Sequence, residues 1–106
     1  MSNPTQQQRE KMEAAAFRKL VQHLRHRTDV QNVDMMGQSG FCRNCLADWY
    51  AEAAADMGHP MDKEAARTAI YGMSPAEWKQ RHQTPASEAQ LALMAESLKK
   101  NEGRGF

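Results

Sequence analysis

Apolar residues recur at helical spacing in several separate stretches of this sequence. Near the start, Phe17, Leu20, Val21 and Leu24 are spaced i, i+3, i+4 and i+7 within residues 6–27, and this spacing is typical of one face of an amphipathic helix. No stretch alternates apolar and polar residues in the way that a half-buried strand does. The pattern therefore predicts an all-helical fold.

Residues 40–57 are predicted to form the helix around which the others pack. Ser39 or Gly40 is its expected start, and Gly58 its expected end. On a helical wheel the apolar side contains Phe41, Cys42, Cys45, Leu46, Trp49, Tyr50, Ala53 and Met57. The opposite side contains Arg43, Asn44, Ala47, Ala51, Ala54 and Ala55. An apolar arc of roughly 180° is wider than a surface helix needs, so we expect this helix to contact more than one neighbour.

Shorter helices are predicted before and after this central helix. Thr28 and Asp29 begin a short helix or a single 3₁₀ turn that Gly37 ends. A further helix should run over residues 62–71, with an aspartate cap at its start and a glycine after its end. Another should begin at Ser74-Pro75, where a capping residue precedes proline at the first helical position.

The last helix is predicted to begin at Thr84-Pro85 and to end near Lys100. Its inward stripe is expected to consist of Leu91, Met94, Ala95 and Leu98. Leu93 lies off that stripe and could mark a surface for a dimer or another protein partner.

Together these elements predict a compact single-domain bundle of four to five helices around the central helix at about residues 40–57. We expect the helical domain to cover residues 9–100, with flexible ends at residues 1–8 and 101–106.

Charge narrows the range of partners. The net charge is only +1, so no overall field attracts nucleic acid or an anionic membrane. Weak nucleic-acid binding through Arg18, Lys19, Arg25 and Arg27 of the first helix stays an alternative, although no aromatic residues are interleaved with these cations. No segment approaches the ~18 apolar residues of a membrane helix, and we expect a cytoplasmic protein.

The chemistry-bearing candidates are Cys42 and Cys45, which are separated by two residues near a helix start. The helix dipole and the adjacent Arg43 should favour thiolate there, and Cys42 is then the expected nucleophile of a redox pair. Alternatively, the two thiols and His23 could bind zinc or another soft metal. A third interpretation, which we prefer, is that both thiols simply pack in the apolar core, so that no cofactor is expected.

Phosphate-binding loops, dinucleotide glycine motifs and serine nucleophile elbows are not found in the sequence. A conventional enzyme is therefore not expected.

Four segments resemble a family that is already defined. The segments are RTDVQN (27–32), GFCRNCLADWY (40–50), ARTAIYGM (66–73) and EWK (77–79). They are similar to a small bacterial family, the domain of unknown function numbered twelve forty-four, over about residues 13–83. The resemblance implies a compact helical domain and supplies no activity and no role for the cysteines. Our sequence-based hypothesis is a non-catalytic accessory or protein-interaction module that binds a protein partner or itself. The main alternative is a metal-binding or redox-responsive protein that uses Cys42 and Cys45.

Overall fold

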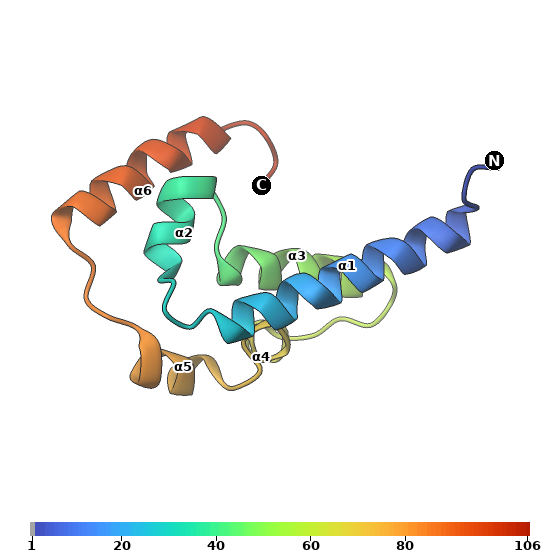
Figure 1. Ribbon diagram of the computed structural model, residues 1–106, viewed down its shortest axis with the longest axis horizontal. Helices are drawn as coiled ribbons and strands as arrows, with labels where there is room; N and C mark the ends of the chain where they lie inside the picture. The colour runs from blue at the N-terminus through green and yellow to red at the C-terminus, as the bar shows by residue number, and fades with distance from the viewer. Residues whose placement is uncertain (1) are drawn as a thin grey trace.

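Six helices make up the regular structure of residues 2–106, which are the residues that the computed structural model describes (Figure 1). They are α1 (Gln6–His26), α2 (Asn32–Ser39), α3 (Arg43–Asp56), α4 (Lys63–Tyr71), α5 (Pro75–His82) and α6 (Glu88–Asn101). No strand is found in this range, so the all-helical prediction is confirmed. The predicted flexible end at residues 1–8 includes Met1, which lies outside the described residues. Among these helices, none is long and apolar enough to cross a membrane.

Local capping signals explain where most of the helices begin. Asp62 accepts a hydrogen bond from an amide in the first turn of α4, and Ser74 does the same for α5, as predicted. The prediction for α6 was wrong, because the helix begins after Ser87, whose side chain and that of Gln90 form a reciprocal capping box. In the central segment, Cys42 rather than Ser39 or Gly40 is the residue before the first helical turn.

The end of α2 also differs from its prediction. Gly37 lies inside the helix instead of ending it. Gly40 ends it in the left-handed conformation, with φ of 79°, which glycine adopts without steric cost.

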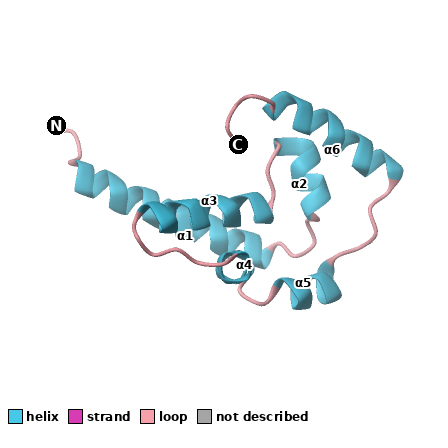
Figure 2. Cartoon of the chain, turned by 180° about the vertical axis from the view of Figure 1, so that it is seen from behind, coloured by secondary structure: helices cyan, strands magenta, loops and turns pink. Residues whose placement is uncertain are grey.

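Two groups of packed helices form the body of the molecule. Helix α2 packs along α6, while α4 contacts α3, α1 and α5 (Figures 1 and 2). The core residues are Val21, Leu24, Met35, Cys42, Leu46, Ala47, Ala66 and Ile70. Because α4 contacts three helices, it lies at least as centrally as α3, which sequence analysis placed at the centre.

The inward face of α3 is rotated from the predicted arc. Leu46 is buried as expected, but Met57 is 76% exposed. Arg43 and Ala47, one turn apart on the side expected to face solvent, are both buried. Ala47 of α3 and Ala66 of α4 have almost no exposed surface, so small side chains let these two helices approach closely.

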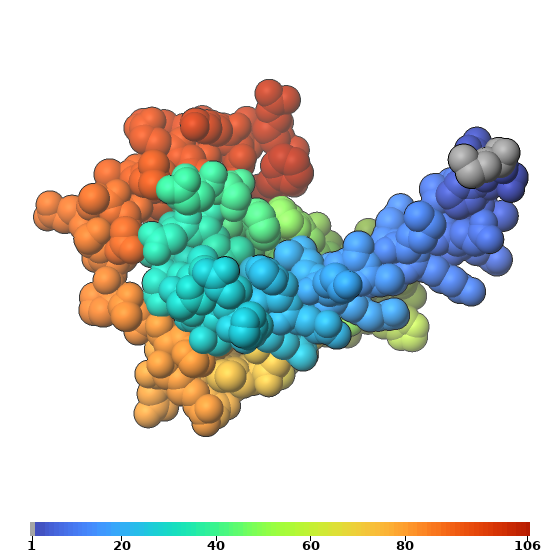
Figure 3. Space-filling model, viewed as in Figure 1, coloured from blue at the N-terminus to red at the C-terminus, as the bar shows by residue number. Residues whose placement is uncertain are grey.

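The first half of α1 extends away from the rest of the chain. In the space-filling view it forms an arm beside the more compact body, and the molecule measures 50 × 30 × 27 Å (Figure 3). Met12 on this arm is 59% exposed. Further along α1, Val21 and Leu24 are buried, but Leu20, which belongs to the predicted stripe, is exposed.

Helix α6 presents a different face to its neighbour than the leucine spacing predicted. Ser97 is buried, and a Cβ atom placed on Gly37 of α2 would lie 3.0 Å from Cγ of Leu93. Leu91 and Leu98 of the predicted inward stripe are instead exposed.

Hydrogen bonds fix this rotation at both ends of α6. Gln90 donates to the carboxylate of Asp34 at 3.0 Å, and Asn101 donates to the carbonyl of Gly40 at 2.8 Å. Gln90 and Asn101 therefore face α2 together with Leu93 and Ser97, because the two amide side chains satisfy polar groups that leucine would leave unpaired.

Candidate functional site

Arg43, in the first turn of α3, is the most completely buried charged side chain of the described residues, with 1% of its surface exposed. One terminal nitrogen, Nη1, donates to the carbonyl of Val30 at 2.8 Å and to Oδ1 of Asn32 at 3.0 Å. The other, Nη2, donates to the carbonyls of Leu24 at 3.2 Å and Arg27 at 2.8 Å. One side chain therefore joins the end of α1, the following turn and the start of α2 to α3.

Neutral groups rather than a carboxylate surround the Arg43 charge. Burial lowers its pKa, because the protein interior solvates the cation less well than water. Two of its acceptors lie at the negative end of the α1 dipole, and the face of Trp78 lies 4.8 Å from its guanidinium carbon. The α1 dipole, the accepting carbonyl groups and the face of Trp78 thus stabilise the cation together.

Tyr71 extends this polar network. Its hydroxyl donates to Oδ1 of Asn44 at 2.6 Å and accepts from Nδ2 of Asn32 at 3.1 Å. Burial raises the pKa of Tyr71, and its ring lies 5.3 Å from that of Trp78. The four segments that carry the family resemblance therefore meet around Arg43, which gives them a structural role.

The two cysteines lie at the opposite edge of the α3 start, where a third sulfur joins them. Cys42 is 6% exposed and Cys45 is half-buried, and their Sγ atoms are 4.0 Å apart. Sγ of Cys45 lies 3.7 Å from Sδ of Met36 in α2. We refer to Met36, Cys42 and Cys45 as the sulfur cluster. Sequence analysis missed Met36, because the contact depends on how the chain folds back between α2 and α3.

The surroundings of Cys42 oppose the thiolate that one of the sequence-based alternatives requires. Burial raises the pKa of this thiol, although the amides of Asn44 and Cys45 oppose the effect. Cys42 is also the less exposed of the two thiols, and the guanidinium of Arg43 contacts carbonyl groups instead. Burial of this kind disfavours the free thiolate that a redox nucleophile requires.

A cleft of about 280 Å³ opens beside the sulfur cluster. Met36, Cys45, Trp49 and Leu98 line it, together with the end of α6 and the residues that follow. Phe106 lies against Trp49, with ring centroids 6.2 Å apart. Two of the three sulfur atoms therefore have an approach from solvent.

His23, the third predicted metal ligand, is exposed on α1. Within residues 2–106, no group of three or more His, Cys, Asp and Glu side chains is close enough to hold one metal ion. The structure therefore brings the two cysteines together without His23.

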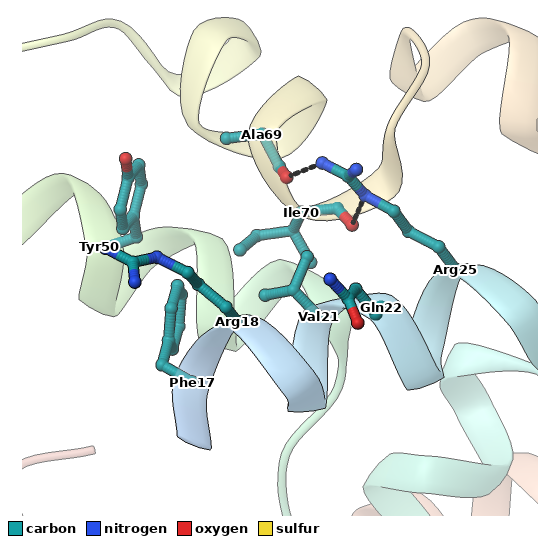
Figure 4. A pocket seen from close by; sticks show the side chains of 8 residues that line it. All are labelled: Phe17, Arg18, Val21, Gln22, Arg25, Tyr50, Ala69 and Ile70. Atoms are coloured by element: carbon teal, nitrogen blue, oxygen red, sulfur yellow. Dashed lines mark hydrogen bonds between the residues drawn. The ribbon is translucent and has the colours of Figure 1, made fainter. Parts of the chain in front are cut away.

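A second cleft, of about 230 Å³, lies where α1 meets α3 and α4 (Figure 4). Arg25 crosses one edge of it and donates to the carbonyls of Ala69 and Ile70 at the end of α4. Arg27 forms an ion pair with Asp29 at 2.9 Å. Two of the four cations considered for nucleic-acid binding therefore have partners within the chain.

The chain also matches a known protein family. The model of a family described as protein of unknown function (DUF1244) matches residues 30–96, which is more than half of the chain. The matched range contains Arg43, Tyr71, Trp78 and the sulfur cluster. No curated protein matches the chain.

Proposed function

This chain belongs to the DUF1244 family, whose description names no activity, and we propose that it is a non-catalytic protein-interaction module that pairs with a second copy of itself through α6. The observation that supports this proposal is the outward face of α6, where Leu91 is 47% and Leu98 is 44% exposed. We refer to Leu91, Met94 and Leu98 as the α6 apolar face. In the proposal the protein works in the bacterial cytoplasm, where reducing conditions keep Cys42 and Cys45 as thiols.

Internal packing does not account for the α6 apolar face. The helix places Gln90, Ser97 and Asn101 toward α2, which leaves Leu91 and Leu98 exposed, with Leu98 at the edge of the cleft beside the sulfur cluster. Burying one leucine stabilises an assembly by about 1.5–3 kcal/mol relative to leaving it in water. Association with a partner that covers this face is therefore favoured, because it buries leucine surface that stays exposed in the single chain.

The symmetry of the face favours a second copy as that partner. Leu91 and Leu98 lie at equal distances along the chain from the helix midpoint, between Met94 and Ala95. In an antiparallel pair, Leu91 of one copy meets Leu98 of the other, and the same contact is made twice.

Charge complements this arrangement. The first turn of α6 contains Glu88, and its last turn contains Lys99 and Lys100. An antiparallel pair places the acidic end of each copy beside the basic end of the other, and it also opposes the two helix dipoles.

Two variants test the proposal by measuring the dimer dissociation constant. Leu91→Glu and Leu98→Glu each place two like charges at the shared face and remove two buried leucines. We expect a loss of at least about 3 kcal/mol, which is more than a hundredfold increase in the dissociation constant. Met12→Glu is the matched control, because Met12 is exposed on the α1 arm.

A charge-reversal series tests the antiparallel orientation. Glu88→Lys should weaken the dimer, and addition of Lys99→Glu and Lys100→Glu on the same chain should restore it. Circular dichroism checks that each variant keeps its helices. The proposal fails if the Leu91→Glu and Met12→Glu proteins associate equally well.

A further inference from the structure

The sulfur cluster combines two thiols and one thioether at the edge of the cleft of about 280 Å³. The separations are 4.0 Å between the sulfurs of Cys42 and Cys45 and 3.7 Å between those of Cys45 and Met36. Cys42 directly precedes α3, Cys45 lies in its first turn, and Met36 lies near the end of α2. The end of α2 and the start of α3 therefore bring three soft donor atoms together.

The sulfur separations match the geometry of a three-coordinate ion. Sulfur ligands lie about 2.3 Å from a d¹⁰ ion such as zinc. Three such ligands arranged in a plane around one ion are about 4 Å from each other. The Cys42–Cys45 and Cys45–Met36 separations both agree with this value, so two of the three sulfur–sulfur distances of such a site are already present.

The kinds of sulfur atom in the cluster determine which metal ions it favours. Thiolate and thioether sulfur together favour soft ions, of which Cu(I) is the biological example. Structural zinc sites instead use four ligands drawn from Cys, His, Asp and Glu. In the part of the chain that the structure describes, no three such side chains gather, and thioether sulfur does not replace them for zinc.

The surroundings of the cluster suit an ion that enters from one side. Met36 and Cys45 line the cleft of about 280 Å³, so they form its entrance, and Cys42 lies behind them with 6% of its surface exposed. Trp49 also lines the cleft and provides a fluorescent reporter beside the site.

We propose that Met36, Cys42 and Cys45 bind one Cu(I) ion in a three-sulfur site. Binding forms two copper–thiolate bonds and one dative bond from the thioether. The two thiol protons leave to solvent, and no electron is transferred. Leu98 belongs both to the α6 apolar face and to the cleft lining, but no sulfur ligand lies on α6, so Cu(I) binding and dimer formation can each fail without the other.

Anaerobic titration of the full chain with Cu(I), in competition with a chromogenic Cu(I) chelator, tests this proposal. We expect one equivalent to bind, with quenching of Trp49 fluorescence. Copper X-ray absorption should show three sulfur neighbours at about 2.3 Å. Cys45→Ser should abolish this binding.

Met36→Leu separates the three-sulfur site from a simple pair of thiols. The substitution keeps the side-chain volume and removes only the thioether, and we expect Cu(I) affinity to fall by about tenfold or more. Met61→Leu is the control, because Met61 is a half-buried core methionine that does not line the cleft. Unchanged helicity in all variants shows that the fold is intact. Failure to retain one Cu(I), copper with two sulfur neighbours, or equal affinity of the Met36→Leu and control proteins would each overturn the proposal.

Discussion

Replacement of Arg43 tests how the four matching segments are held together. Its guanidinium donates to four oxygen atoms, the carbonyls of Leu24, Arg27 and Val30 and Oδ1 of Asn32. Arg43→Met keeps much of the volume but removes every donor. At about 1 kcal/mol for each lost hydrogen bond, the variant should lose about 4 kcal/mol of unfolding free energy.

That loss is partly offset, because the variant no longer has to bury a cation. A domain of this size has only about 5–15 kcal/mol of stability in total, so we expect a marginally folded protein. Arg43→Lys keeps the charge and up to three donors but not the planar fork, and we expect about half of the loss. Comparison of the two variants therefore separates the contribution of the positive charge to stability from that of the planar guanidinium group.

Urea denaturation followed by circular dichroism measures both losses. Arg81→Met is the matched control, because Arg81 is exposed and pairs only with Glu77; such surface pairs contribute about 0–1 kcal/mol. If Arg43→Met unfolds at the same urea concentration as the control, Arg43 does not hold the segments together and the argument is refuted.

Two further predictions concern backbone conformation and pH. Gly72→Ala should destabilise the protein more than Gly58→Ala. Both glycines have φ near 80°, but only at Gly72 would the new Cβ lie 2.9 Å from the side chain of Arg25. The urea midpoints of the two variants measure the difference, and equal midpoints would contradict this prediction. Burial raises the pKa of Cys42 and Tyr71, so each group holds its proton more tightly in the folded state, and unfolding free energy should fall as pH rises through the ordinary thiol and phenol ranges. A Cys42→Ala, Tyr71→Phe double variant should show a flatter dependence on alkaline pH, and a slope as steep as that of the unmodified protein would argue against these shifts.

Local signals in the sequence were sufficient for much of the fold. The capping residues Asp62 and Ser74 act on amides within three residues, so their helices could be predicted without knowledge of tertiary contacts. The rotation of α6 could not, because Gln90 and Asn101 bond to Asp34 and Gly40, which lie 56 and 61 positions away. Leucine spacing alone predicted a different face, which includes Leu91 and Leu98.

Burial of Arg43 was missed for a related reason. An arginine on a helix is usually solvated, and its acceptors here are main-chain carbonyls that any sequence supplies. The useful signal was Ala47 one turn later, since a small residue at i+4 marks the side on which α4 can approach α3.

Only part of the candidate site could be predicted from the sequence. The spacing of Cys42 and Cys45 identified two sulfurs, and helix geometry was enough to bring them together. Met36 lies in another helix, beyond a turn that ends at Gly40, and only the folded chain shows its contact with Cys45. The sequence left zinc and other soft metals open, and the Met36 thioether is the reason that we propose Cu(I) among them.

Pairing through α6 is tested most directly by the molar mass of the unmodified protein in solution. Sedimentation equilibrium at rising protein concentration should show the mass approach twice the 12.0 kDa of one chain. A mass that stays at 12.0 kDa up to the highest soluble concentration would contradict the proposal that a second copy covers Leu91 and Leu98.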